Sequence, residues 1–308
     1  MRVGIIGTGY VGLVTGVTLA NIGHDVICVD KDNNKIKKLE KGLSPIYEKD
    51  LENLMYKNKK RLYFTNDYKK LLKETSLIFI CVGTPEKEDL TVNLDYIYDV
   101  CNNLLNNVCQ DSIVIIKSTV PIGTNDKIEK FLNSNSKYSF KVVSNPEFLS
   151  QGTAVYDSLY PSRIIIGTCD RYAENLMKNL YKPLTIAPYN VPILTVSRNA
   201  AELIKYVSNS FLAIKLSYIN EVANLCNKIE VNIDDVVMGM GLDNRIGKYY
   251  LKAGIGYGGS CLPKDTNALY KFSLAEGSEI KTLKTCIDVN QKQNLILFEK
   301  IKQAFGGN

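Results

Sequence analysis

The sequence predicts an α/β fold, a doubly wound parallel sheet followed by a mainly helical domain with a long linking helix. In the first half of the 308 residues, short apolar runs alternate with segments of helical period, a pattern typical of strands joined by crossover helices. From Arg198 to about Ile229, apolar residues then recur at helical spacing without Pro or Gly. We therefore expect two domains, residues 1–197 and 198–308, which suits about 150 residues per domain.

Buried strands are expected where a short apolar run is bounded by turn or helix signals, because strands of a parallel sheet are covered on both faces. Helical patterns lie between these runs and continue after the long helix. The expected strands are Val3–Ile6, Val26–Val29, Leu62–Phe64, Leu77–Val82, Ile113–Ile116, Val142–Val143, Ile164–Ile166 and Ile193–Val196. The expected helices besides the long one are Val11–Ile22, Asn93–Asn106, Asn125–Asn133, Ile233–Met240, Thr266–Ala275 and Ile280–Ala304.

Composition and charge exclude several classes of protein. Hydrophobic residues make up 45% and charged residues 23%, so the chain is globular rather than disordered. The net charge is +6, and the lysines that give rise to it are scattered along helix-like segments, as on a solvated surface. A nucleic-acid partner is therefore not expected. No stretch approaches a membrane span, and the glycines between Gly4 and Gly16 argue against a signal peptide. We expect a cytoplasmic protein.

Eight cysteines show no CxxC pair, and His24 is the single histidine, so a metal site is not expected. His24 precedes the second strand, where we expect a loop residue. Most cysteines lie in apolar runs or helical patterns and are expected to be small core residues in a reduced cytosol. These are Cys28, Cys81, Cys101, Cys169, Cys226 and Cys286.

A glycine-rich motif, Gly7-Thr-Gly-Tyr-Val-Gly12, follows the first strand and opens the first helix. Its glycines permit a tight turn and close approach to a pyrophosphate, and the helix start offers free N–H groups to phosphate oxygens. Asp30 closes the second strand, where a carboxylate accepts hydrogen bonds from ribose hydroxyls and repels a 2′-phosphate. Together these features indicate a Rossmann-like domain that binds NAD rather than NADP. The alternative is a glycine-rich turn beside a surface aspartate.

Two further loops place hydroxyls and glycines at strand ends, where ligands bind in open α/β sheets. They are Cys81–Pro85, with Thr84, and Ser118–Thr124, with Thr119. Taken singly, each is also compatible with ordinary turn chemistry.

Cys261 differs from the other cysteines because it lies in the loop Gly254–Asp265, which is rich in glycine. Flanking glycines let backbone amides approach a ligand, and a cation such as Lys264 favours the nucleophilic thiolate. A tight turn with an incidental cysteine remains the alternative from chemistry alone.

The chain resembles the UDP-glucose/GDP-mannose dehydrogenase family through motifs that span nearly its whole length in family order. The matching stretches are GTGYVGL (Gly7–Leu13), VGTP (Val82–Pro85), STVPIGT (Ser118–Thr124), NPEFL (Asn145–Leu149), AELIKYVSNSFLA (Ala201–Ala213) and GYGGSCLPKD (Gly256–Asp265).

The resemblance implies NAD-dependent, four-electron oxidation of a sugar-nucleotide primary alcohol to a carboxylate, through a thiohemiacetal and a thioester on Cys261. The GYGGSCLPKD and NPEFL stretches favour UDP-glucose as substrate and UDP-glucuronate as product. GDP-mannose and a UDP-N-acetylhexosamine are alternatives within the class. A non-catalytic NAD-binding and dimerising module is the alternative of another class.

By the same resemblance, Lys205 and Asn209 stabilise the oxyanion at the reacting C6 oxygen, and on one helix they face the same side. Asp265 is implied to support a water or a proton transfer, Glu147 to take part in thioester hydrolysis, and Thr119 to contact cofactor and water. Without the resemblance, Lys205 would read as a surface lysine.

Further contacts follow from the resemblance position by position. Arg245 is implied to reach the sugar of the neighbouring subunit, and such a role suits a bidentate guanidinium. The implied cofactor contacts are Gly7, Gly9, Tyr10, Val11, Gly12, Asp30, Lys35, Thr84, Thr119 and Lys264. The implied substrate contacts are Glu147, Phe148, Leu149, Lys205, Asn209, Arg245, Tyr249, Tyr250, Lys252 and Gly258.

Two departures from the family pattern stand out. Gln151 occupies the position of a second family glutamate, and its neutral amide cannot act as a base. The family continues into another nucleotide-binding domain that this sequence does not contain, so we expect a truncated catalytic core. We also expect a homodimer through the helix at 198–229, and a core helix of one domain is the alternative interpretation of this segment. The expected small-molecule partner is a UDP-sugar.

Overall fold

The computed structural model describes residues 1–306, which divide into two compact units. Residues 1–84 and 93–205 form the sheet unit, and residues 85–92 with those from 206 onward form the helical unit. Each unit is described by itself.

Within the described residues, the strands of the sheet unit form one sheet in the order β3-β2-β1-β4-β5-β6-β7-β8. All neighbouring strands pair in parallel except β6 and β7, which meet in antiparallel orientation at Ser144 and Gly167. The part β3-β2-β1-β4-β5-β6 has the strand order of the dinucleotide-binding doubly wound fold, in which β1 lies next to β4. The predicted fold class is confirmed. The strands are β1 (Arg2–Ile6), β2 (Asp25–Val29), β3 (Leu62–Thr65), β4 (Leu77–Ile80), β5 (Ser112–Ile116), β6 (Phe140–Ser144), β7 (Ile164–Gly167) and β8 (Ile193–Val196).

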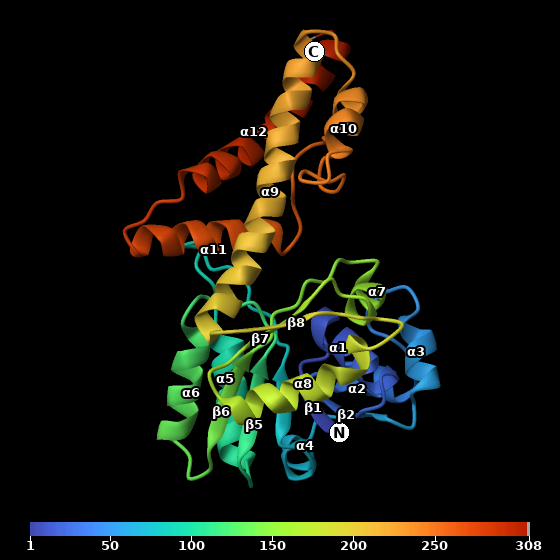
Figure 1. Ribbon diagram of the computed structural model, residues 1–308, viewed down its shortest axis with the longest axis vertical. Helices are drawn as coiled ribbons and strands as arrows, with labels where there is room; N and C mark the ends of the chain where they lie inside the picture. The colour runs from blue at the N-terminus through green and yellow to red at the C-terminus, as the bar shows by residue number, and fades with distance from the viewer. Residues whose placement is uncertain (307–308) are drawn as a thin grey trace. The chain divides into compact units, whose positions relative to one another are not determined.

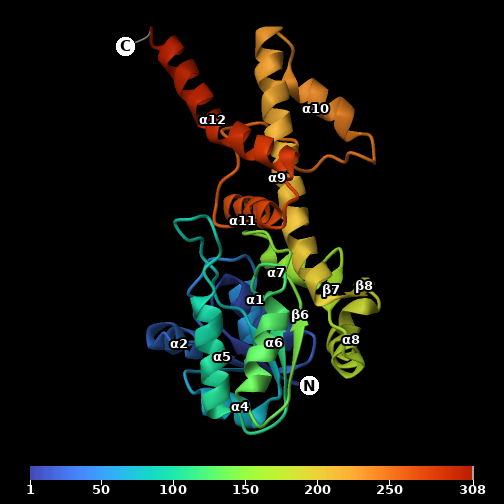
Figure 2. The same cartoon turned by 90° about the vertical axis from the view of Figure 1, so that its left-hand side faces the viewer.

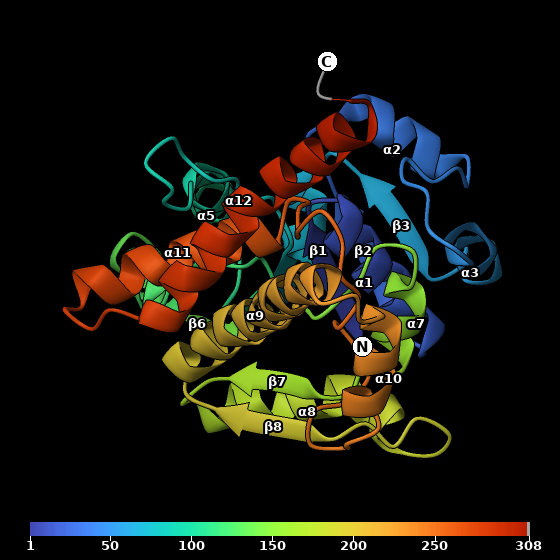
Figure 3. The same cartoon turned by 90° about the horizontal axis from the view of Figure 1, so that it is seen from above.

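Helices cover the sheet on both faces because successive side chains of a buried strand point to opposite sides. Phe79 belongs to a core that includes residues of α1, α2, α3, α7 and α8, whereas its neighbour Ile80 belongs to a core that includes residues of α4, α5 and α6. Figure 2 shows α5 and α6 side by side, and Figure 3 shows α8 beside β7 and β8. The helices are α1 (Tyr10–Asn21), α2 (Asn33–Glu40), α3 (Leu51–Lys57), α4 (Tyr68–Glu74), α5 (Asp95–Asn107), α6 (Thr124–Ser134), α7 (Ala154–Leu159) and α8 (Arg171–Thr185).

The long predicted helix is α9 (Arg198–Lys228), which begins in the sheet unit and continues in the helical unit (Figure 1). The helical unit also contains α10 (Ile233–Gly241), α11 (Leu262–Ala275) and α12 (Lys281–Ala304). Helices α11 and α12 pack against each other, as Figure 3 shows. The last predicted helix, Ile280–Ala304, is confirmed by α12, and Gly306 just after it has a φ of 75°. Residues 307 and 308 lie outside the described residues.

Of two expectations about single residues, the one for Cys169 is wrong and the one for His24 is confirmed. Cys169 is exposed rather than buried, because the apolar run ends with Gly167 and Cys169 falls in the turn before α8. His24 lies in the expected turn before β2, but it is buried, and its Nε2 donates a hydrogen bond to the carbonyl oxygen of Leu180 at 2.8 Å. Burial lowers the pKa of His24, so it is a neutral packing residue at neutral pH. In residues 1–306, no helix is long and apolar enough to cross a membrane.

Among the glycines of the described residues, Gly12 has the least room for a side chain. A Cβ built there would lie 1.8 Å from the carbonyl oxygen of Gly7, whereas one built at Gly9 would meet nothing within 4 Å. We predict that Gly12→Ala lowers the free energy of unfolding by about 3 kcal/mol or more, while Gly9→Ala changes it by less than about 1 kcal/mol. Urea denaturation of both variants measures the difference. Equal stabilities would contradict the close helix-to-turn contact.

Candidate functional site

The glycine motif forms a tight turn between β1 and α1. Gly7 has a φ of 95°, a conformation that glycine adopts without strain, and its N–H donates to the carbonyl oxygen of Val29 at 2.8 Å. Gly9 is the N-cap of α1 and has no side chain to occupy the first-turn N–H groups. The open space beside Gly9 lets a phosphate approach these N–H groups. The turn therefore fits a dinucleotide pyrophosphate.

Asp30 lies at the end of β2 and is held by backbone and side-chain donors. Its Oδ2 accepts from Thr8 N and Thr8 Oγ1, each at 2.8 Å, and its Oδ1 accepts from Asp32 N at 3.0 Å. Burial alone would raise the pKa of Asp30, but the Asp32 and Thr8 donors outweigh burial and keep it below its ordinary value. Asp30 is thus ionised at neutral pH, as a ribose acceptor must be.

A cleft of about 510 Å³ lies beside this turn, and its volume suits a small ligand. Its lining includes Gly7, Gly9, Asp30 and Lys35, so the structure brings these predicted cofactor residues together. Lys35 Nζ is 3.8 Å from Asp30 Oδ2. The cleft wall also contains Tyr68 and Tyr96, aromatic side chains that the sequence did not single out because they lie outside any motif.

Tyr10 and Val11 do not belong to the lining of this cleft. The Tyr10 hydroxyl instead donates to Glu48, a buried carboxylate that also accepts from Gly152 N and Ala154 N, each at 2.9 Å. Burial and this contact raise the pKa of Tyr10 to about 12. Tyr10 therefore anchors the start of α7 to the start of α1.

The loops after β4 and β5 are bonded to each other, as expected for the carboxyl edge of the sheet. Thr84 Oγ1 donates to the carbonyl oxygen of Thr119 at 2.8 Å. Ser118 Oγ donates to the carbonyl oxygen of Val82 at 2.6 Å. The structure thus brings the predicted cofactor residues Thr84 and Thr119 together.

Glu147 and Lys205 form a buried ion pair in the sheet unit. Lys205 Nζ is 2.9 Å from Glu147 Oε1, and their side chains are only 5% and 9% exposed. The other carboxylate oxygen of Glu147 accepts from Leu149 N at 2.6 Å. The Phe148 ring lies beneath two cations, with Arg163 at 3.9 Å and Lys205 at 5.4 Å from its centroid. This pair provides a desolvated ammonium and a carboxylate, the groups needed to stabilise an oxyanion and activate water.

Lys117 belongs to the same region and was not predicted as a site residue. Its Nζ donates to Asn145 Oδ1 at 3.3 Å, and that oxygen also accepts from the Tyr181 hydroxyl at 2.6 Å. Burial lowers the pKa of Lys117. Lys117, Asn145 and Glu147 line a small cavity of about 60 Å³. In the sequence, the one feature that could have indicated Lys117 as a site residue is its place directly after the apolar run of β5.

Asp265 is the centre of a polar cluster in the helical unit. Its Oδ2 accepts from Asn209 Nδ2 at 2.6 Å, its Oδ1 is 2.6 Å from Lys264 Nζ, and the residue is 1% exposed. Lys205 and Asn209 are one turn apart on α9, so they lie on the same side of that helix. Each of these two predicted oxyanion donors has its own carboxylate partner.

Cys261 is exposed and occupies the N-cap position of α11. Its carbonyl oxygen accepts from Asp265 N at 2.9 Å, and its Sγ is 3.7 Å from Ser260 Oγ. Lys264 is bonded to Asp265, so the direct ion partner of this lysine is the carboxylate. An accessible sulfur at a helix start is suited to nucleophilic attack.

The remaining predicted substrate residues lie in an exposed segment of the helical unit before Cys261. Arg245 Nε is 3.0 Å and Arg245 NH2 2.6 Å from Asp243, and its side chain is 89% exposed. Tyr250 has a φ of 60°. Tyr249, Lys252 and Gly258 are also exposed, and their contacts with substrate stay predictions. In the described part of the chain, no group of three or more His, Cys, Asp or Glu residues is placed to hold a metal ion.

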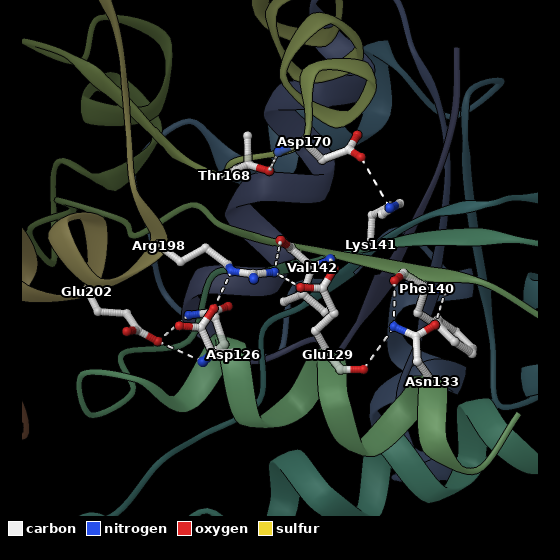
Figure 4. A network of polar contacts seen from close by, with 11 residues as sticks. Asp126, Glu129, Asn133, Phe140, Lys141, Val142, Thr168, Asp170, Arg198 and Glu202 are labelled. Carbon is white, nitrogen blue, oxygen red and sulfur yellow. Dashed lines mark hydrogen bonds and ion pairs between the residues drawn. The ribbon is translucent and has the colours of Figure 1, made fainter.

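The start of α9 is anchored to α6 by a charged network that the sequence did not predict (Figure 4). Arg198 Nε is 2.6 Å from Asp126, and Arg198 also pairs with Glu129. Glu202 is buried and accepts from Gly123 N at 2.6 Å and from Asn125 N at 2.8 Å. Glu202 lies one turn before Lys205, so this network holds the helix that carries Lys205.

The profile of the UDP-glucose/GDP-mannose dehydrogenase family, NAD binding domain, matches residues 1–185, and the profile of its central domain matches residues 199–292. The chain belongs to the UDP-glucose/GDP-mannose dehydrogenase family. The predicted family and the predicted NAD cofactor are thereby confirmed.

Individual members of the family match the whole chain. UDP-glucose 6-dehydrogenase YwqF of Bacillus subtilis (strain 168) is 47% identical over 311 residues, which cover 100% of this chain and 70% of that protein. UDP-glucose 6-dehydrogenase of Rhizobium meliloti (strain 1021) is 43% identical over 314 residues, covering 100% and 71%. The structure of a UDP-glucose dehydrogenase from the hyperthermophilic archaeon Pyrobaculum islandicum superposes with a TM-score of 0.94 at 34% identity, covering 99% and 71%.

In this family member, the buried pair of Glu147 and Lys205 should couple strongly. We predict that Lys205→Met lowers the free energy of unfolding by about 3–5 kcal/mol, because Glu147 is left charged and unpaired. The double variant Lys205→Met/Glu147→Gln should recover most of this loss, since neither position of the pair then carries a charge. Denaturant unfolding of the single and double variants measures the coupling. Simply additive losses would contradict a buried ion pair.

Proposed function

We propose that the chain oxidises UDP-glucose to UDP-glucuronate with NAD⁺ through a covalent Cys261 thioester. The observation that carries the proposal is an exposed cysteine at the start of α11, in a chain whose full-length relatives are named UDP-glucose 6-dehydrogenase. A solvent-accessible thiol supports the proposed nucleophile.

In the first oxidation, the C6 hydroxyl loses a proton and C6 loses a hydride. Bound NAD⁺ supplies the hydride acceptor. Lys205 and Asn209 donate hydrogen bonds to the C6 oxygen while negative charge develops there. The Cys261 thiolate then adds to the aldehyde carbon, the carbonyl π bond opens, and the C6 oxygen takes up a proton, which gives a thiohemiacetal. The covalent bond keeps the aldehyde from escaping.

In the second oxidation, the thiohemiacetal carbon loses a hydride and its hydroxyl loses a proton, which gives a thioester; a second NAD⁺ would supply the hydride acceptor. Water adds to the thioester carbonyl, the C–S bond breaks, and the carboxylate leaves with the Cys261 thiolate regenerated. The proposal assigns the positioning of this water and the acceptance of its proton to Glu147, Asp265 and Thr119. Gln151 carries no charge and is exposed, so base catalysis rests with Glu147 and Asp265.

Substrate binding and assembly complete the proposal. The nucleotide sugar is contacted by Phe148, Leu149, Tyr249, Tyr250, Lys252 and the backbone of Gly258. Arg245 reaches the substrate site of a second copy of the chain. A homodimer through α9 is supported by its exposed apolar side chains, among them Val207 at 43% and Phe211 at 63% exposure. Lys264 contacts the cofactor.

Counting NADH tests the covalent route. The chain should release two NADH per UDP-glucose consumed, and Cys261→Ala should release none while its affinity for NAD⁺ changes less than about twofold. Cys169→Ala, which removes another exposed thiol, is the matched control and should keep the ratio. One NADH with accumulating aldehyde, or normal turnover in Cys261→Ala, would refute the thioester.

The same assay distinguishes the alternatives. Faster turnover of GDP-mannose or UDP-N-acetylglucosamine than of UDP-glucose would reassign the substrate within the family. NAD⁺ binding without NADH from any sugar nucleotide would indicate a non-catalytic module.

Asp30 should determine cofactor choice. Asp30→Ala should weaken NAD⁺ binding roughly 10- to 100-fold, because charge-assisted hydrogen bonds to ribose are lost. It should also reduce the ratio of the affinity for NAD⁺ to that for NADP⁺, because the charge that repels a 2′-phosphate is removed. Asp25→Asn, at the other end of β2, is the control and should bind both cofactors as the unmodified chain does. Titration calorimetry with NAD⁺ and NADP⁺ measures both affinities. An unchanged preference in Asp30→Ala would remove this assignment.

A further inference from the structure

The loop that leads to Cys261 has no regular secondary structure between Gly254 and Gly258. Its backbone groups therefore need partners outside a strand or helix. Those partners are amide side chains of α12 and of the part of α9 that lies in the same helical unit.

Asn290 of α12 binds the backbone of Tyr257 on both sides. Tyr257 N donates to Asn290 Oδ1 at 2.7 Å, and Asn290 Nδ2 donates to the carbonyl oxygen of Tyr257 at 3.0 Å. One side chain thus replaces the two hydrogen bonds that a neighbouring strand would supply.

Two further amides hold Gly254, at the beginning of the loop. Gly254 N donates to Asn220 Oδ1 at 2.7 Å, and Gln293 Nε2 donates to the carbonyl oxygen of Gly254 at 2.9 Å. Asn220 and Gln293 are buried, and Asn224 Nδ2 donates to Gln293 Oε1 at 3.1 Å, which orients that amide. The loop is therefore fixed at both Gly254 and Tyr257.

Gly256 shows how closely the loop approaches α12. It has a φ of 106°, and a Cβ built there would lie 2.6 Å from Asn290 Oδ1. A side chain at this position would displace the Asn290 amide from Tyr257.

Tyr257 in turn covers a buried thiol. Its hydroxyl is 3.7 Å from the Sγ of Cys286, and Ser217 Oγ is 3.3 Å from the same sulfur. Cys286 is 4% exposed and shares a small core with Ala213 and Tyr257. Release of the loop would uncover this sulfur, so Cys286 reports the position of the loop.

We propose that Asn290 is a positioning residue for the nucleophile: by holding Tyr257, it presents Cys261 at the start of α11. The proposal rests on the proposed function, because it takes Cys261 as the nucleophile. Gln293 and Asn220 share the task by holding Gly254. Asn290 does not contact the reacting atoms in this assignment.

The test compares Asn290→Ala with Asn294→Ala, an exposed asparagine on the same helix. Asn290→Ala should lower kcat roughly 10- to 100-fold, because a small misplacement of a reacting group costs that much, while KM for NAD⁺ changes less than about twofold. Iodoacetamide should alkylate Cys286 at least about tenfold faster than in the unmodified chain. Peptide mass spectrometry should find Cys226, buried on α9, still protected. Asn294→Ala should match the unmodified chain.

Gly256→Ala is the second variant, because it disturbs the same contact from the loop side, and it should give the same signature. Equal exposure of Cys226 and Cys286 in both variants would indicate general unfolding and overturn a positioning role. Unchanged kcat with Cys286 protected would also overturn it, even where Cys261→Ala is inactive. Conversely, turnover by Cys261→Ala would reject the thioester mechanism. The alkylation rate of Cys286 would still show whether Asn290 holds the loop.

Discussion

In three loops near the predicted site residues, backbone N–H groups are satisfied by carboxylate and amide side chains rather than by neighbouring strands. Glu48 accepts from the turn before α7, Glu202 from the start of α6, and Asn290 from the loop before α11. An unpaired buried N–H is costly, so each acceptor holds its loop in one conformation. The sheet and helices supply the framework, but these side chains determine where the chemical groups lie.

The predicted oxyanion donors are held by carboxylates in the same way. Lys205 forms an ion pair with Glu147, and Asn209 donates a hydrogen bond to Asp265. A desolvated ammonium without a partner would be destabilising, and a buried carboxylate without donors equally so. Both side chains are therefore already oriented by their carboxylate partners, as the proposed stabilisation of a substrate oxygen requires.

The framework was predictable from sequence because burial on both faces leaves apolar runs, as in Leu77–Ile80, and because the long amphipathic pattern of α9 has no breaker. Lys117, Glu202 and Asn290 were not predictable in this way. Their partners lie far away in the chain, and a polar residue on a helix or at a strand end looks like a solvated one. Cys169 shows the reverse error, since an apolar neighbourhood in sequence does not ensure burial beyond the last paired residue.

The contact of Thr8 with Asp30 links two positions that sequence motifs treat separately. Both the N–H and the hydroxyl of Thr8 donate to one oxygen of Asp30. A lineage that exchanged Asp30 for a neutral residue would leave the Thr8 hydroxyl buried without its acceptor, and selection would then act on residue 8 as well. Substitutions at positions 8 and 30 are therefore expected to co-vary among relatives, and redesign of the ribose end of the site has to treat them as one unit.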